Sequence, residues 1–532
     1  MDRNSLAPTV LPCVRLPAAA GIVLCLLFRT AAFAGPEARC GTPFLPSRPH
    51  PVSAAKRTAA ETFDVGDPLT VRVFNFAALP GTDPYYLTTT TCRLKGEHCY
   101  IFVEDEIWGG SRVTPAALTS LSRAFDRSTP RYPDRGIYSI DIEIFGPPPD
   151  ADGDPRVVIV LLDIMDSILS GTILGYYDTA NQASPVGREI LYIDSDPLDL
   201  NSDLARATLA HEFQHMLHWN GDPDEDRWVD EGCSEYAELA CGYKNTTGEV
   251  ARNYLGVPNL LRSPDPNLPV PPNTGLTDAA SWSEGDFLPF LFDQTFLLMT
   301  YFAQRYGDTA VARLVAEPAN GIDGFNRTLE SVGARERFDQ FWADWAAAVF
   351  VNDGGDLGFR DLTIGPVRRD TVSVPANDIG GALQLWGIDY IVPRSSGPPG
   401  LSLDVRSDSD LLVTLVSERD DSHDVAAVPV RRGLPRRIGL YGNSPTALAV
   451  TRTSPGAHAY TLSLAARAGD APAAADFDAS GTVGFSDFIA FAAGFGKSAG
   501  RPGFDPSFDL DGDGTVSFSD FIMFARNFGR SP

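Results

Sequence analysis

The sequence predicts several domains: an α+β domain, then a β-sandwich, then a small helical module. Strand-like runs give way to long amphipathic stretches between residues 200 and 352, short alternating runs return from about 360 to 466, and a repeated Asp-rich loop follows. The predicted parts are a signal peptide at 1–34, a linker or pro-segment at 35–62, the α+β domain at 63–352, a β-sandwich accessory domain at 360–466, a linker at 467–475 and the helical module at 476–532.

The composition is that of a folded, acidic protein. The chain has 532 residues, of which 43% are hydrophobic, and 69 Asp and Glu against 43 Lys and Arg give a net charge of −26. At roughly 150 residues per domain, this length predicts three or four domains. Because phosphate backbones repel so acidic a chain, the charge argues against a nucleic-acid partner.

The first residues have the pattern of an export signal. Arginines precede the apolar run Ala18–Phe28, and the small residues Ala32 and Ala34 precede a predicted cleavage after Ala34. No later run approaches the ~20 apolar residues of a transmembrane helix. We therefore expect a secreted, extracellular protein with no membrane span, in which residues 35 to about 60 form an unfolded linker or pro-segment.

Hydrophobic periodicity predicts the individual elements. The stretch from Leu69 to Ile144 is strand-like with one helical interruption, and a continuous apolar run further on is typical of a buried strand. The expected helices are Pro115–Phe125, Leu204–Trp219, Phe287–Tyr306 and Phe338–Phe350, and the expected buried strand is Val157–Leu162.

Five cysteines follow the leader: Cys40, Cys92, Cys99, Cys233 and Cys241. An odd number in an oxidising compartment leaves at least one thiol without an intramolecular disulfide. A short hairpin can bridge Cys92 and Cys99, whereas Cys233 and Cys241 are too far apart within one helix. Because the chain has no Cys-x-x-Cys pair, we expect no thiolate ligand at a zinc site.

One motif carries chemistry: His211-Glu212-Phe213-Gln214-His215, an HExxH sequence in a stretch free of Gly and Pro. On a helix the two histidines lie one turn apart on one side, so both imidazoles can bind one zinc ion. Glu212 is then placed to hold a zinc-activated water, act as the general base and later protonate the leaving amine.

A catalytic zinc ion needs a third protein ligand and one open position. Downstream, Trp228-Val-Asp-Glu-Gly begins another predicted helix, in which Glu231 and Glu235 are one turn apart. One glutamate can bind the metal while the other accepts a hydrogen bond from a ligand imidazole. His218 lies ~10 Å along the helix from His211 and cannot join both motif histidines at one metal.

The sequence His211-Glu-Phe-Gln-His-Met-Leu-His-Trp, followed by Trp228-Val-Asp-Glu-Gly, resembles the gluzincin metallopeptidases, and most of all their bacterial hyicolysin-like members. The resemblance covers roughly residues 65 to 352 and is specific within 204–240. It implies a zincin-like catalytic domain in which Glu231 is the third zinc ligand. Glu235 would then support a ligand from behind, and it remains the alternative ligand.

Two departures from that family bear on activity. The chain lacks the Gly-x-Met-x-Asn substrate loop of the aminopeptidase branch, which favours an endopeptidase or a different specificity altogether. The family usually has a downstream Tyr or His to stabilise the oxyanion, but residues 281–296 contain neither. The oxyanion donor therefore stays unassigned.

The C-terminal part contains two copies of a loop, 33 residues apart (509 − 476), that match the EF-hand calcium loop. Oxygen-bearing side chains fall at loop positions 1, 3, 5 and 12, a glycine at 6, and a backbone carbonyl is supplied at 7. The predicted ligands are Asp476, Asp478, Ser480, Thr482 and Asp487 in the first loop and Asp509, Asp511, Asp513, Thr515 and Asp520 in the second. We expect two structural Ca²⁺ ions, without which the carboxylates repel one another and the module does not fold.

An aspartate at the last loop position, with no clear helix before the loop, resembles the dockerin type I repeat. The resemblance implies an EF-hand-like dockerin module at residues 476–532, whose role is either to dock to a cohesin-like partner or to stabilise the secreted chain. Together the motifs predict a secreted zinc-dependent metallopeptidase, an endopeptidase acting on a protein or peptide substrate. Two alternatives stay open: a catalytically inactive zincin-like binding protein, and a zinc hydrolase of a non-peptide amide or ester.

Overall fold

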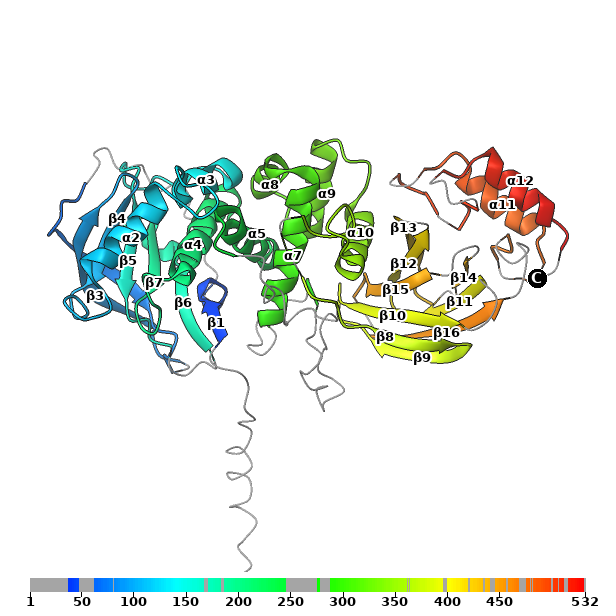
Figure 1. Cartoon of the computed structure of the whole chain (residues 1–532), viewed down its shortest axis with the longest axis horizontal. Coiled ribbons are helices and arrows are strands. Elements are labelled where there is room, and N and C mark those ends of the chain that lie inside the picture. The colour runs from blue at the N-terminus through cyan, green and yellow to red at the C-terminus, as the bar shows by residue number, and fades with distance from the viewer. Residues whose placement is uncertain are drawn as a thin grey trace, which may run out of the picture.

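The computed structural model has a seven-stranded sheet at one end, two smaller sheets toward the other, and a block of helices between them (Figure 1). The structure describes residues 37–46, 62–79, 81–166, 171–182, 186–244, 275–277, 288–360, 362, 364–395, 400–419, 422–433, 436–440, 445–455, 458–467, 475–478, 480, 482–498, 501–505, 507–510 and 515–530. The predicted signal peptide, 1–34, lies outside these ranges. Among the helices that are described, none combines the length and apolar composition needed to cross a bilayer.

The seven-stranded sheet is mixed and has the order β1-β6-β7-β5-β4-β3-β2. Its strands are β1 (Glu37–Cys40), β2 (Pro68–Phe74), β3 (Tyr85–Lys95), β4 (Cys99–Glu104), β5 (Val157–Leu162), β6 (Gly171–Tyr177) and β7 (Ile190–Asp194). The central strands β4 and β5 are parallel and wholly buried, as expected of a sheet covered on both faces. Apolar clusters occupy each face, and one of them continues into the helices.

The helices of this half pack on one face of the sheet and extend beyond it. They are α2 (Pro115–Asp126), α3 (Ile137–Phe145), α4 (Asp203–Gly221), α5 (Arg227–Cys241), α7 (Leu288–Tyr306), α8 (Asp308–Val315), α9 (Gly321–Ser331) and α10 (Phe338–Val351). An aromatic group from α2, α3 and α4 packs within this layer: Phe213 lies 5.0 Å from Phe125 and stacks on the partly buried Tyr138 at 5.7 Å, measured between ring centroids.

Two antiparallel-rich sheets follow. The first has the order β13-β12-β15-β10-β8 and the second β14-β11-β16-β9, and side chains from both form one apolar cluster. Their strands are β8 (Asp370–Val374), β9 (Ala376–Ala382), β10 (Ile388–Ser395), β11 (Gly400–Ser407), β12 (Leu411–Arg419), β13 (Ser422–Val430), β14 (Arg436–Leu440), β15 (Pro445–Arg452) and β16 (Ala459–Arg467).

Helix α10 joins these sheets to the helical half. Trp342 Nε1 donates to Thr451 Oγ1 at 3.1 Å, and Tyr390 OH donates to the carbonyl of Ala346 at 2.9 Å. Trp386 packs against Trp342 with ring centroids 5.3 Å apart. The largest apolar cluster of the molecule therefore runs without interruption from the seven-stranded sheet to β10, β12 and β15.

The C-terminal module contains α11 (Phe485–Gly494) and α12 (Phe518–Asn527). Its two halves exchange backbone hydrogen bonds reciprocally: Val483 pairs with Gly529 and Arg530, and Val516 pairs with Gly496 and Lys497. These residues correspond under the 33-residue repeat, so the halves are arranged with approximate two-fold symmetry.

Three expectations are corrected. Residues 37–46 are folded, because β1 joins the sheet edge beside β6 and is followed by a 3₁₀ turn at Thr42–Phe44. Ile137–Phe145 is a helix and not a strand. Its alternating isoleucines are typical of a strand, but its apolar side chains pack with those of α4, which stabilises the helix. Cys92 and Cys99 form no disulfide, because they face opposite sides of the sheet and belong to different clusters.

Candidate metal centre

Helix α4 holds the HExxH motif inside the protein. Ser202 caps its N-terminus by accepting a hydrogen bond from Ala205 N at 3.1 Å. The helix lies close to β6 because position 175 is glycine: a Cβ there would come within 2.9 Å of Glu212 Cγ and 2.8 Å of Thr208 Cγ2. The motif is consequently buried.

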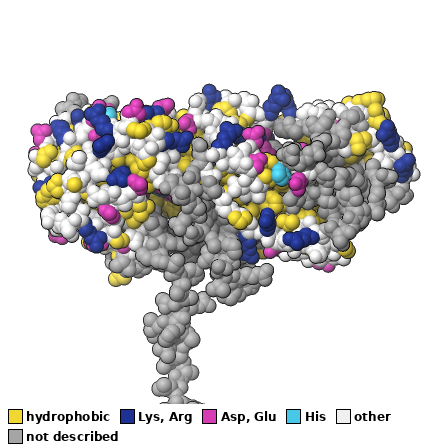
Figure 2. All heavy atoms as spheres, viewed as in Figure 1, with side chains coloured by type: hydrophobic (Ala, Val, Ile, Leu, Met, Phe, Trp, Pro, Cys, Tyr) yellow, Lys and Arg dark blue, Asp and Glu magenta, His cyan; other side chains and the backbone are white. Residues whose placement is uncertain are grey.

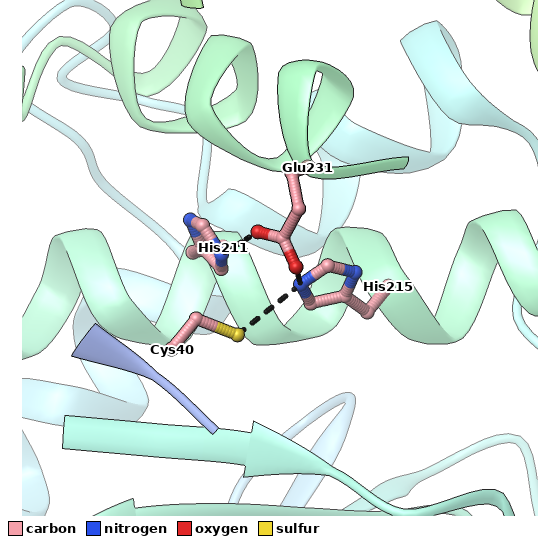
Figure 3. Close-up of side chains that lie close together, drawn as sticks. All are labelled: Cys40, His211, His215 and Glu231. Atoms are coloured by element: carbon pink, nitrogen blue, oxygen red, sulfur yellow. Dashed lines mark hydrogen bonds and ion pairs between the residues drawn. The ribbon is translucent and has the colours of Figure 1, made fainter. Parts of the chain in front are cut away.

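Helix α5 brings a glutamate to the two histidines. Trp228 stacks on Phe325 with centroids 5.3 Å apart, and Gly232 lets α5 approach α7, because a Cβ there would lie 3.1 Å from the Thr295 carbonyl oxygen. These contacts fix the first turn of the helix, from which the carboxylate of Glu231 points at α4 (Figure 3).

The predicted zinc ligands come together. His211 Nε2 lies 3.3 Å from Glu231 Oε2, and His215 Nε2 lies 3.6 Å from Glu231 Oε1. All three side chains are almost completely buried. Glu235, the alternative ligand, lies behind His211 instead, with its Oε1 3.8 Å from Nδ1 of that ring, and it pairs with Lys244.

A fourth donor converges on the same point: Sγ of Cys40, from the end of β1, lies 3.4 Å from His215 Nε2 (Figure 3). The absence of a Cys-x-x-Cys pair predicts no thiolate at this site, whereas the structure places the thiol of Cys40 among the predicted ligands. The parallel pairing of β1 with β6 brings Cys40 across 175 residues of sequence. The available signal was the odd number of cysteines, which leaves one thiol without a disulfide.

These four side chains fit a zinc ion. In a tetrahedral site, bonds of ~2.0–2.1 Å to nitrogen or oxygen and ~2.3 Å to sulfur place the ligand atoms ~3.3–3.6 Å apart. The separations of 3.3, 3.6 and 3.4 Å agree with that spacing. Within the described part of the chain, His211 Nε2 and Glu231 Oε2 are buried facing each other and form no hydrogen bond, as expected of atoms that bind a cation between them.

The outer nitrogens of both histidines have carboxylate partners. Nδ1 of His211 lies 3.0 Å from Glu238 Oε1, and Nδ1 of His215 lies 2.9 Å from Asp230 Oδ2. Such partners fix the tautomer and orientation of a ligand imidazole. The sequence predicts a supporting carboxylate but assigns that role to Glu235, whereas Glu238 is the shorter contact to His211 and Asp230 the contact to His215.

The electrostatics of the centre favour a cation. Burial alone would lower the pKa of His215, but the charges of Asp230 and Glu231 outweigh it and raise that pKa well above its usual value. Burial would likewise raise the pKa of Asp230, and the adjacent His215 instead holds it well below normal. A positive charge between these groups is thus stabilised by the surrounding carboxylates.

Glu212 lies beside the four donors. Burial raises the pKa of its carboxyl group. Its Oε2 accepts a hydrogen bond from Thr42 Oγ1 at 3.1 Å, while its Oε1 is buried without a partner among the described residues. A carboxylate with one free oxygen at the edge of a metal centre is placed to take a proton from a bound water.

His218 plays a different part, as its spacing predicts. Its Nδ1 lies 3.1 Å from Asp230 Oδ1, so Asp230 links it to His215.

Of the stretch 281–296, where an oxyanion donor is expected, residues 281–287 lie outside the described part.

The first predicted calcium loop also gathers its acids. Carboxylate oxygens of Asp476, Asp478 and Asp487 lie within 4.8 Å of one another. Asp487 accepts hydrogen bonds from the backbone of Asp478 and of Gly484 at 3.0 and 2.7 Å, and Ser480 Oγ donates to the Thr482 carbonyl at 3.1 Å.

The second loop is described in part. Asp511 and Asp513 lie outside the described residues. Asp520 accepts hydrogen bonds from the backbone of Leu510 at 2.5 Å and of Ser517 at 2.7 Å. The bond from Ser517 corresponds under the repeat to the bond from Gly484 in the first loop, whereas the other is displaced by one residue.

Comparison with known proteins gives one informative similarity. A relative is the neutral metalloprotease ShpI of Staphylococcus hyicus, 32% identical over 169 residues, which are 28% of this chain and 36% of that protein. The chain thus matches little more than a third of the relative's length, and the similarity indicates a metallopeptidase through a distant, partial homologue.

No protein-family model matches the chain. Among solved structures, a family GH115 4-O-methyl-α-glucuronidase aligns over 60% of this chain and 54% of that one, with 11% identity and a TM-score of 0.11. Agreement at that level carries no information about fold or function.

Proposed function

We propose that this chain is a zinc-dependent metallopeptidase that hydrolyses peptide bonds within protein substrates. One observation carries the proposal: His211, His215 and Glu231 converge with zinc-like spacing beside Glu212, a buried carboxylate with one oxygen free. The partial similarity to a neutral metalloprotease supports the same activity.

Each residue has a defined role. His211, His215 and Glu231 hold the zinc ion, which when bound supplies a Lewis acid that lowers the pKa of water and polarises the scissile carbonyl. Glu212 takes the proton of the attacking water and passes it to the leaving nitrogen, so that the amine departs neutral. Glu238 and Asp230 keep the two imidazoles oriented with Nε2 toward the metal.

The remaining parts serve an exported enzyme. The leader at 1–34 directs secretion. The C-terminal module has a dockerin-like role: it binds two Ca²⁺ ions and docks to a cohesin-like protein. Its aromatic residues support docking, because hydrophobic side chains gather where α11 and α12 reach the surface (Figure 2), and equivalent positions of the repeat are exposed in both halves, Phe485 by 68% and Phe518 by 65%.

Metal content and proteolysis, measured side by side, test the activity. The protein is purified with calcium, loaded with zinc, and assayed on casein beside its Glu212→Gln variant. Because Cys40 lies within bonding distance of the same metal, both forms are also made with Cys40→Ala. We expect about one zinc per chain in every form, and cleavage only where Glu212 is present.

The alternatives predict other outcomes. Zinc without cleavage in either background, combined with hydrolysis of small esters or non-peptide amides, would replace the peptidase by another zinc hydrolase. Zinc without any hydrolysis would indicate a binding protein built on a peptidase fold. A folded protein that takes up no zinc would overturn the metal centre itself.

A further inference from the structure

We propose that Cys40 is the fourth zinc ligand and keeps the enzyme latent, with the segment Glu37–Phe44 acting as an inhibitory strap built into the chain. The inference rests on the proposed function, because latency has meaning only for an active peptidase. It adds that the position needed by the attacking water is filled by a thiolate of this chain, and that activity requires the strap to leave.

The position of the thiol is the first argument. Cys40 Sγ, His211 and His215 nitrogens and a Glu231 oxygen all lie within 4.8 Å of one another, and each of the four residues is buried. A catalytic zinc site keeps one position open, whereas four protein ligands close it. With Cys40 in place, no coordination position remains for water.

The strap is held there by the fold. β1 pairs in parallel with β6, and the register shifts between Arg39 and Cys40. Such a bulge re-aims a side chain. Gly41 N then donates to the Gly175 carbonyl at 2.8 Å, and no larger residue fits at position 41, because a Cβ would lie 2.6 Å from Phe76 Cζ and 2.9 Å from Ile173 Cγ2.

The strap also engages the catalytic carboxylate. Thr42, two residues after Cys40, donates from Oγ1 to Glu212 Oε2 at 3.1 Å, and the same hydroxyl accepts from Tyr177 N at 3.0 Å. One short segment therefore contacts both the metal ligands and the general base. A substrate and its attacking water need the same two places.

A purely structural four-ligand zinc site is the competing explanation. Such a site needs no general base, yet Glu212 is buried beside this one with Oε1 unpartnered among the described residues. The strap lies at the edge of the seven-stranded sheet, so its release breaks only one strand pairing. Both features fit a removable ligand better than a structural one.

Metal spectroscopy tests the ligand directly, independently of activity. The full chain is loaded with Co²⁺, and the sulfur-to-cobalt charge-transfer absorption is recorded for the parent, for Cys40→Ala and for Cys92→Ser, a control that removes a buried thiol elsewhere in the sheet. We expect the absorption in the parent and in Cys92→Ser, and its loss in Cys40→Ala. Its absence from the parent would overturn the proposal.

Kinetics test the latency. If the open form is populated at 1–10% in the parent, Cys40→Ala should raise casein cleavage by about 10- to 100-fold, while Cys92→Ser leaves the rate unchanged. A variant that loses the sulfur signal and binds zinc, but cleaves casein no faster than an active parent, would show that Cys40 is only a structural ligand and would overturn the latency.

A chemical route covers the case in which Cys40→Ala does not fold. The zinc-free native chain is treated with iodoacetamide, which forms a C–S bond on the thiolate with loss of iodide, and is then reloaded with zinc. We expect zinc to protect Cys40, detected by peptide mass, and the alkylated protein to be active. Equal labelling with and without zinc would contradict coordination. Protection of Cys40 with no cleavage in any form would instead refute the peptidase and keep the ligand.

Discussion

The two metal-binding regions proposed for this chain are built in opposite ways. The zinc centre draws its donors from three elements, the consecutive helices α4 and α5 and the distant strand β1, and all four donors are buried. The calcium loop draws its acids from a single short run, 476–487, in which Asp478 is exposed. The small apolar core of this module includes Ala475, Val483 and Phe524.

The difference concerns what sets the geometry. At the zinc centre the protein core orients the ligands, since each histidine is also held by Asp230 or Glu238. In the tail, the proposed Ca²⁺ ions would neutralise the acids and so hold the ligands in position. The zinc centre should therefore survive metal removal, while the tail should not.

The carboxyl groups of the seven-stranded sheet and of the tail also differ in their pKa values. Burial raises the pKa of Asp194, at the end of β7, to about 7. In the tail, hydrogen bonds from Ser486 and Ser480 lower the pKa of Asp478 to about 2. Burial thus favours a neutral acid at Asp194, whereas the loop favours an ionised acid at Asp478. At the zinc centre the adjacent His215 reverses the effect of burial on Asp230.

The largest expected effect is loss of the general base. Glu212→Gln keeps the shape of the side chain but cannot accept the proton, so casein cleavage should fall by about 10²- to 10⁴-fold in the Cys40→Ala background. Zinc content should be unchanged. Glu225→Gln is the control, because that half-buried glutamate accepts from Gly321 N at 2.7 Å and does not belong to the zinc centre. Equal losses in both variants would contradict the assignment.

Calcium removal should separate the two regions. Chelation should lower the free energy of unfolding of the tail by about 2.7 kcal/mol if calcium is otherwise present at 100 times its Kd. Hydrogen exchange measured by mass spectrometry should rise in α11 and α12 and stay constant in α4. Asp476→Ala should reproduce the effect with calcium present, and Asp505→Ala, outside the predicted ligands, should not. Unchanged exchange in α11 and α12 would refute calcium-dependent folding.

The orienting carboxylates should matter less than the ligands. Asp230→Ala removes the partners of His215 and His218, and zinc affinity should fall by about 10- to 100-fold, measured by competition with a chromophoric chelator. Asp203→Ala, at the exposed start of α4, should leave the affinity unchanged. An Asp230→Ala variant with parental affinity would mean that the core orients His215 without this carboxylate.

The smallest effect concerns pH. The folded pKa of Asp194 is raised above its unfolded value, so its contribution to stability is complete below about pH 4 and is lost as the pH rises toward 7. Asp194→Asn can still accept from Ile164 N, a bond of 3.0 Å in the parent. Between pH 4 and 7 the free energy of unfolding, measured with urea, should fall by on the order of 1–2 kcal/mol less in the variant than in the parent. Parallel curves would contradict the shift.

Local patterns predicted much of the secondary structure. Val157–Leu162 is a strand with the predicted bounds, and the helices predicted at Pro115–Phe125 and Phe338–Phe350 each extend one residue further. Here burial and periodicity agree. In Ile137–Phe145 the sequence pattern and the structure disagree. From Tyr138 to Ile144 every second residue is apolar, which predicts a strand, but packing against the neighbouring helices makes the segment helical.

The site was predictable to the extent that it is local. His211, Glu212 and His215 follow from one helical motif, and the resemblance adds Glu231. Cys40 depends on a parallel pairing between β1 and β6, which leaves no periodic trace in a four-residue strand. Glu238 was missed because its approach to His211 depends on the packing of α5 against α4.

The contacts of α10 determine where the chain can be truncated and which of its domains can be swapped. Trp342 and Tyr390 form hydrogen bonds between α10 and the five-stranded sheet, and both side chains are buried. A truncation after residue 352 would expose that surface to water and should yield insoluble protein. Gene fusions and domain swaps should instead join at 467–475, so the peptidase region and the two sheets are expected to be inherited together while the tail is replaced.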